Sequence, residues 1–458
     1  MNMNTPEKAK QELAAKLEKI YKKADESLVR AEVEIEKQDL LKWLVSQRYK
    51  TRLYFSGRDA EDMETAGIGA ADTVLQPTNP DYKALFQHMR KHLTAKYPNL
   101  RYYGGSAFAA GHTDADWEAF GACRFTVPRF ELWVRNKRTF LACNVLVNKA
   151  KRDTLNEVLA ELEQLNFSEY REFSPPGDMV SRTDFPNYEQ WIKNLTGVIK
   201  EIRDGKYQKT VLARKVLLQF DTNPEPVSIL SFLKQMRANR YDFLFQVDET
   251  NTFLGSSPER LYKREGRSIK SEALAGTRVR GEKEKDDIQL ANELMASSKE
   301  QLEHDFVIDA IEDVLRRLCV SLEKDDKKNL LKLKETQHLI TQFKGILKAG
   351  VTDEVILDTL HPTPAVGGCP LKEALQAIEE WEPFKRGWYA GVIGSVGYDG
   401  CDFAVGLRSG RIDHTGLSLY SGVGIVDGSL PKDEWYEVES KITTFMDMFM
   451  GKVANENK

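Results

Sequence analysis

The stretch that decides the fold is KTVLARKVLLQF, residues 209–220, in which β-branched and aliphatic residues predominate. Its composition and length are typical of a β-strand. Lys209 opens this strand and shares a face with Val211 and Ala213, because side chains alternate along a strand. If that face is buried, the loss of hydration lowers the pKa of the lysine towards values useful in a general base. The alternative is a lysine at a strand end whose ammonium group reaches water.

The segments around this strand occur in clusters of strands and clusters of helices. Residues 241–247 and 252–255 predict a β-hairpin, residues 391–428 predict a glycine-rich β region, and residues 286–318 predict one long helix. Residues 6–38 have the pattern of one or two charged helices. This clustering favours an α+β layered architecture over a doubly wound parallel sheet.

Charge and cysteine content exclude several classes of protein. The 66 basic and 70 acidic side chains give a net charge of −4, which argues against a nucleic-acid partner. The five cysteines are scattered and form no CxxC pair, so neither a disulfide framework nor a cysteine-based zinc site is indicated. The N-terminus lacks an apolar signal core, and no apolar run reaches about 18 residues. We therefore expect a cytoplasmic protein without a membrane partner.

Two helices are predicted to place carboxylates at or beside their apolar faces. On the helix at 286–318, Val307 and its apolar neighbours lie within about 40° of Glu303. On the helix that begins near residue 432, Glu434 lies beside the apolar stripe, Glu437 on its flank and Lys441 at its border. A buried carboxylate is unfavourable unless it is paired, protonated or bound to a cation. Salt bridges explain these positions equally well, but acidic ligands from two helices also suit Mg²⁺ with an anionic substrate.

Two further positions have the pattern of an anion site. Arg408, like Lys209, lies at the end of an apolar strand. Gly422 and Gly424, in YSGVGIV at residues 420–426, follow a strand and can present backbone N–H groups to an anion. The segment is not GxGxxG and no helix follows at once, which argues against a dinucleotide site.

Seven motifs in a fixed order carry a more specific signal than any one of these features. They are KTVLAR (209–214), SPERL (257–261), LAGTR (274–278), SKE with EHD (298–300 and 303–305), LHPTPAVGG (360–368), GVGIV (422–426) and EWYE (434–437). Together they resemble the chorismate-utilising enzymes, which include anthranilate synthase component I, and most closely the isochorismate synthases. The resemblance is strong over about residues 205–445 and loose over the first 200 residues.

The resemblance implies a fold and a reaction. The fold is a large layered α/β/β/α sandwich built on two mostly antiparallel sheets. The reaction is the reversible, Mg²⁺-dependent conversion of chorismate to isochorismate, in which water adds at C2 and the C4 hydroxyl leaves. The resemblance assigns Lys209 as the base that activates water and Glu259 as the acid that protonates the departing hydroxyl. It assigns Glu303 and Glu437 as the metal ligands.

The resemblance also implies a set of residues that contact the substrate. These are Gly276, Thr277, His338, Arg408, Gly422, Gly424 and Lys441.

Other chemistries on the same scaffold remain as alternatives. Anthranilate and aminodeoxychorismate synthases use ammonia, commonly from a glutamine amidotransferase subunit, whereas HPTPA at residues 361–365 looks like the isochorismate synthase form, for which no such subunit is expected. Salicylate synthase shares the base and the acid and is the nearest alternative. The long N-terminal part resembles menaquinone-pathway enzymes more than the shorter siderophore-pathway ones. A chorismate-binding scaffold without catalysis is the non-enzyme alternative. The intact set of implied catalytic and metal-binding residues argues against it: Lys209, Glu259, Glu303 and Glu437.

The length of 458 residues would ordinarily give two or three domains at about 100–200 residues each. No linker-like segment separates the two halves, and the implied catalytic pair and metal ligands lie between Lys209 and Glu437. We therefore expect one large domain over residues 1–458. In it, residues 1–50 form a helical N-terminal extension and about 205–445 form the catalytic core.

Overall fold

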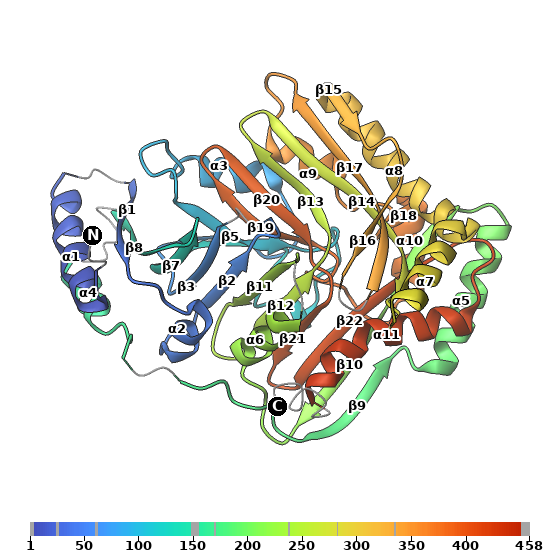
Figure 1. Cartoon of the computed structure of the whole chain (residues 1–458), viewed down its shortest axis with the longest axis horizontal. Coiled ribbons are helices and arrows are strands. Elements are labelled where there is room, and N and C mark those ends of the chain that lie inside the picture. The colour runs from blue at the N-terminus through green and yellow to red at the C-terminus, as the bar shows by residue number, and fades with distance from the viewer. Residues whose placement is uncertain are drawn as a thin grey trace.

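Strand β10 (Lys209–Phe220) lies near one end of the larger of two antiparallel sheets, with the bounds that the sequence predicts (Figure 1). The computed structural model describes residues 4–23, 27–59, 63–147, 155–168, 171–236, 239–281, 283–333 and 336–449. Over these residues the larger sheet follows the spatial order β1 (Ser27–Ile35), β8 (Arg138–Val147), β7 (Phe130–Arg135), β3 (Glu64–Ile68), β2 (Arg52–Ser56), β11 (Tyr241–Gln246), β12 (Thr252–Ser257), β21 (Ser409–Asp413), β22 (Gly416–Ile425), β10 and β18 (Gly368–Cys369). Strand β9 (Met179–Phe185) pairs with the second half of β10.

The smaller sheet also mixes strands from both halves of the chain. Its spatial order is β15 (Cys319–Lys324), β17 (Thr336–Leu347), β14 (Ser268–Val279), β13 (Arg260–Glu265), β20 (Gly400–Val405), β19 (Val392–Gly397), β5 (Arg101–Ser106), β6 (Cys123–Val127) and β4 (Asp72–Gln76). Strand β16 (Asn329–Lys332) pairs with β17. The predicted hairpin at 241–255 is confirmed as β11 and β12 of the larger sheet.

The two sheets pack face to face around a shared core. Thr65 Oγ1 on β3 of the larger sheet lies 3.0 Å from the hydroxyl of Tyr103 on β5 of the smaller one. The hydroxyl of Tyr241 on β11 donates to Asp402 Oδ1 on β20 at 2.9 Å. All of these side chains are buried, so they link the two sheets across the core. The predicted layered sandwich on two antiparallel sheets is confirmed.

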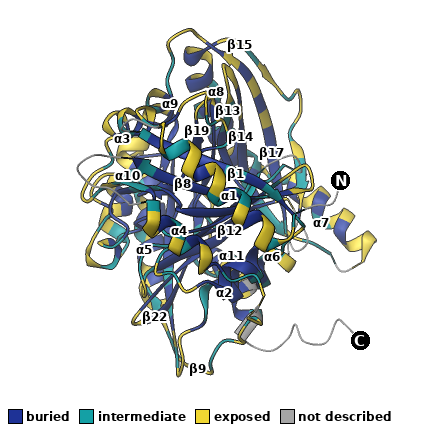
Figure 2. Ribbon diagram, turned by 90° about the vertical axis from the view of Figure 1, so that its left-hand side faces the viewer, coloured by how far each residue is buried: buried dark blue, intermediate teal, exposed yellow. Residues whose placement is uncertain are grey.

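Helices form the outer layers, and their exposed residues face away from the sheets (Figure 2). They are α1 (Pro6–Tyr21), α2 (Leu40–Ser46), α3 (Tyr82–Arg90), α4 (Leu155–Glu163), α5 (Tyr188–Arg203), α6 (Pro226–Met236), α7 (Glu284–Ala296), α8 (Ser298–Leu318), α9 (Asp353–Leu360), α10 (Leu371–Trp381) and α11 (Pro431–Phe449), with one 3₁₀ turn at Ala115–Trp117. Helix α8 packs on β14 and β17, and α11 packs on β22. Within the described ranges, no helix combines the length and the apolar character that crossing a bilayer requires.

Two element predictions are wrong. Residues 27–35 form strand β1, which pairs with β8, so the expected N-terminal extension is not purely helical. Val29, Ala31, Val33 and Ile35 alternate with polar residues and are buried, a period of two that the helical interpretation missed.

The helix predicted at 286–318 is two helices, because Ser297 adopts an extended conformation and caps the second of them. Its hydroxyl accepts a hydrogen bond from the Glu300 N–H at 3.4 Å.

Candidate active site

A cavity of about 700 Å³, counted outside the protein atoms and including its mouth, is lined by both sheets together with α8 and α11. Ten of the eleven residues implied by the resemblance line it: Glu259, Gly276, Thr277, Glu303, His338, Arg408, Gly422, Gly424, Glu437 and Lys441. The eleventh, Lys209, lies directly behind Glu303, as described next.

Lys209 is the first residue of β10, and its side chain is 0% exposed. The alternative in which its ammonium group reaches water is therefore wrong. Its Nζ lies 3.1 Å from Glu303 Oε1, and among the described residues it makes no hydrogen bond of good angular geometry. The structure thus holds an amine inside the protein with a carboxylate of α8 as its ion-pair partner.

Glu259 follows β12 and is 4% exposed. Its backbone is fixed on both sides, because its N–H donates to Ser257 Oγ at 3.3 Å and its carbonyl accepts from the Val405 N–H at 3.1 Å. Burial, reinforced by the nearby Glu272, raises the pKa of Glu259 to about 8, although Lys209 and Arg408 oppose the shift. The carboxyl group is therefore protonated at neutral pH and is able to donate a proton.

Helices α8 and α11 bring four carboxylates and two lysines together beside the cavity, next to Lys209 of β10. Three of the carboxylates are paired: Glu303 with Lys209 at 3.1 Å, Glu434 with Lys299 at 2.5 Å, and Glu437 with Lys441 at 2.7 Å. Burial raises the pKa of Glu303, but the ammonium groups of Lys209 and Lys299 outweigh it, and the net shift is downward.

The fourth carboxylate is Glu300, one helical turn before Glu303. Burial and the charges of Glu303 and Glu437 raise its pKa to about 7. In addition, Glu434 Oε2 is buried without a hydrogen-bond partner in the described part of the chain. The carboxylate oxygens of these two helices are the type of donor that a hard divalent cation prefers.

Glu300 received no role from the sequence, and Glu434, although it was placed beside an apolar stripe, is not among the metal ligands that the resemblance implies. The signal that identifies them is their spacing, because each lies three residues before an implied metal ligand and therefore on the same side of its helix. Tyr389 and Ser421 also line the cavity, and no sequence pattern indicates them.

One wall of the cavity is shaped by a bulge in β14. The pairing of β14 with β17 shifts between Ala275 and Thr277, and Gly276 has a φ of +70°, a conformation that favours glycine. The bulge places Thr277 opposite His338, whose Nδ1 lies 3.1 Å from Thr277 Oγ1. Burial lowers the pKa of His338 well below its usual value, so this wall presents a neutral imidazole.

The opposite wall carries the cationic groups and the two glycines. Arg408 lies between β20 and β21 with a φ of +48°, a strained conformation for a residue with a side chain. Lys441 Nζ donates to the Gly422 carbonyl at 3.0 Å. A Cβ atom at Gly424 would lie 2.1 Å from Glu303 Oε1, so glycine leaves room for that carboxylate in its present position beside β22.

Comparisons with known proteins agree with this geometry. The family model described as chorismate binding enzyme matches residues 15–450. The chloroplastic isochorismate synthase of Catharanthus roseus is 33% identical over 97% of this chain and 85% of its own length.

Two solved structures share the fold. The structure of MenF, the menaquinone-specific isochorismate synthase of Escherichia coli, is 26% identical with a TM-score of 0.83, and the match covers 96% of this chain and 99% of that one. DhbC of Bacillus anthracis, described as a 2,3-dihydroxybenzoate-specific isochorismate synthase, is 26% identical with a TM-score of 0.71, over 89% of this chain and 99% of that one.

Proposed function

We propose that this chain, which belongs to the chorismate binding enzyme family, is an isochorismate synthase. The observation that carries the proposal is one cavity that is lined by a protonated carboxyl group, Glu259, and by Glu303, behind which lies the fully buried Lys209. An amine and a neutral acid are the two groups that exchange of a hydroxyl requires. The names of the relatives point to the same reaction.

In the proposed reaction, Lys209 first releases the proton that it carries in its ion pair with Glu303, and its neutral Nζ then accepts a proton from the water that adds at C2 of chorismate. As the new C–O bond forms, the ring double bonds shift and the C4–O bond breaks. Glu259 donates its proton to the departing hydroxyl, which leaves as water, so that atoms and charge balance. Burial keeps Glu259 in the protonated form that this step needs.

The remaining residues bind and orient a dianionic substrate. Arg408 and Lys441 supply positive charge at the cavity wall, and the neutral His338 supplies a hydrogen-bonding group. Glu303 and Glu437 would hold Mg²⁺, which when bound supplies a Lewis acid that neutralises a substrate carboxylate.

We further propose a role in menaquinone biosynthesis and a cytoplasmic location. The menaquinone-specific relative superposes with a TM-score of 0.83 and the 2,3-dihydroxybenzoate-specific one with 0.71, at equal identity. The test is whether this chain restores menaquinone to an Escherichia coli strain that lacks MenF and any other isochorismate synthase. Normal levels of isochorismate without restored menaquinone would argue against this pathway.

Incubation of the purified chain with chorismate and Mg²⁺, followed by separation of the products, tests the reaction itself. We expect an equilibrium mixture of chorismate and isochorismate. Release of salicylate and pyruvate would identify a salicylate synthase, and turnover only with ammonia would identify an aminating enzyme. Binding of chorismate without turnover would leave the scaffold alternative.

A further inference from the structure

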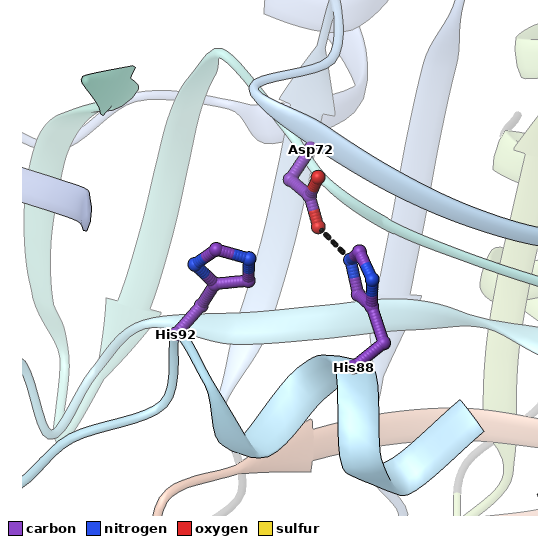
Figure 3. A group of neighbouring side chains, drawn as sticks. All are labelled: Asp72, His88 and His92. Carbon is purple, nitrogen blue, oxygen red and sulfur yellow. Dashed lines mark hydrogen bonds and ion pairs between the residues drawn. The ribbon is translucent and has the colours of Figure 1, made fainter. Parts of the chain in front are cut away.

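Three potential metal ligands meet at the edge of the smaller sheet, outside the cavity described above (Figure 3). Asp72 is the first residue of the edge strand β4, and His88 lies in the last turn of α3. The His92 N–H donates to the Met89 carbonyl at 3.0 Å, so the chain is still turning at His92. The two histidines are four residues apart, a spacing that places both on one side of a helical turn.

The three side chains converge on one point. A ligand atom of each residue lies within 4.8 Å of those of the other two. His88 Nε2 is 2.7 Å from Asp72 Oδ2, and the His88 and His92 rings are 5.4 Å apart at an interplanar angle of 61°. Figure 3 shows the His92 ring directed towards the Asp72–His88 pair.

An ordinary ion pair explains only two of these residues. Asp72 and His88 satisfy each other, and the Tyr102 hydroxyl also donates to Asp72 Oδ2 at 2.5 Å. His92, in contrast, has a buried Nδ1 without a hydrogen-bond partner among the described residues. The His92 imidazole therefore lies beside a carboxylate and a second imidazole, and no hydrogen bond of its side chain to the described residues explains this position.

We propose that Asp72, His88 and His92 bind a divalent transition metal ion of the Zn²⁺ type. Two imidazoles and a carboxylate are a common set of protein ligands for Zn²⁺, with water in the fourth position. At metal–ligand distances of about 2.0–2.2 Å the three ligand atoms would lie about 3.3–3.6 Å apart. Side-chain rotation would therefore lengthen the present 2.7 Å contact between His88 and Asp72 and bring His92, which lies within the 4.8 Å limit, closer to them.

The surroundings suit such a site. The Asp72 side chain is 10% exposed and that of His88 is 34% exposed, which leaves one side open for entry of the ion and for a water ligand. Tyr102 is buried and orients the carboxylate through its hydrogen bond, the arrangement that commonly supports a ligating carboxylate. The bound ion would join the end of α3 to the edge strand β4.

The test is titration of the full-length, chelator-treated chain with Zn²⁺ by calorimetry, in excess Mg²⁺ so that the carboxylate cluster is saturated. We expect one Zn²⁺ per chain. His88→Gln and His92→Gln should each weaken binding by more than about 100-fold, because loss of a mere supporting residue already costs about 10–100-fold. His414→Gln, which changes an exposed histidine far along the chain, is the matched control and should bind as the wild type does.

A milder variant and a spectrum keep the proposal testable if a glutamine variant fails to fold. Tyr102→Phe retains the buried ring and should weaken Zn²⁺ binding by about 10-fold. Co²⁺ added to the wild type in place of Zn²⁺ should give the intense visible absorption of a four-coordinate ion, and Zn²⁺ should abolish it. Absence of a one-to-one binding event in the wild type, or unchanged affinity in His92→Gln, would overturn the proposal.

Discussion

At the scale of single residues, the ionisation of Glu259 links burial to the proposed reaction. Its pKa is raised to about 8, mainly by burial, and the reaction needs the protonated form. We expect kcat/KM to fall as the pH rises through about 8, because the free enzyme then loses its proton donor. A pH–rate profile of isochorismate formation measures this fall in kcat/KM. A kcat/KM that stays constant up to pH values well above 8 would contradict the assignment of Glu259 as the proton donor.

The same ionisation predicts an effect on stability that does not depend on turnover. Between the ordinary pKa of 4.5 and the folded value of about 8, the native state holds a proton that the unfolded chain has lost, so stability falls as the pH rises across this interval. The slope from one such group is about 1.4 kcal/mol per pH unit. Glu259→Gln removes this pH dependence. Chemical denaturation at several pH values should therefore show that the free energy of unfolding of the variant rises relative to that of the wild type, by up to about 3 kcal/mol over two pH units. Parallel stability curves would show that Glu259 is not buried as a neutral acid.

Lys209 is the residue whose removal should separate binding from chemistry. Lys209→Ala deletes the amine that accepts the proton, so we expect loss of water addition with little change in Mg²⁺-dependent chorismate binding. Calorimetry with chorismate and a product assay on the same preparation measure the two effects. Lys215→Ala is the matched control, since that lysine lies on the same strand, pairs with Asp116 and does not line the cavity. Near-normal turnover of Lys209→Ala would mean that another group is the base.

At the scale of elements, the site depends on how closely α8 approaches β22. Gly424 has no side chain where Glu303 Oε1 lies, and a Cβ atom there would also be 3.0 Å from Lys209 Cε. Gly424→Ala should therefore displace Glu303 and Lys209 together and lower kcat at least about 100-fold, as misplacement by about 1 Å does in other enzymes. An active Gly424→Ala enzyme would contradict the close packing described here.

Elements with strong local patterns could be predicted from the sequence, and those set by long-range pairing could not. Strand β10 and the hairpin of β11 and β12 were predictable because apolar runs and a short turn define them locally. Strand β1 was misread because its charged residues hid a period of two, and only pairing with β8, more than a hundred residues away, shows it to be a strand. The break at Ser297 was missed although the residue is a good helix cap.

The site itself was predictable only through its motifs. Periodicity identified Glu303 and Glu437 as carboxylates at or near apolar faces, but the meeting of α8 with α11 is a tertiary event that no local pattern encodes. The Asp72–His88–His92 cluster was missed for the same reason, since Asp72 lies on a strand and both histidines near a helix end.

At the scale of the whole molecule, the strand order argues that the catalytic residues do not form a separate unit. In the larger sheet β11 lies between β12 and β2, and in the smaller sheet β19 lies between β20 and β5. The second half of the chain thus pairs along two full strand edges with the first half. We propose, accordingly, that the whole chain is one domain, with residues 1–50 built into it through β1 and α1.

The proposal of one domain predicts the behaviour of a fragment. Residues 205–445 alone keep every residue assigned to the site, but they would expose the edges of β11 and β19 and the apolar faces that β2, β3 and β5 cover. Unpaired, apolar strand edges promote aggregation. We therefore expect the fragment to aggregate or to lack cooperative unfolding, while the full chain unfolds in a single transition when near-ultraviolet circular dichroism and activity are followed together. Addition of residues 1–204 as a separate chain during refolding is the control, because it restores the missing strands without a covalent link. A fragment that folds cooperatively and converts chorismate would show that the catalytic core is a domain of its own.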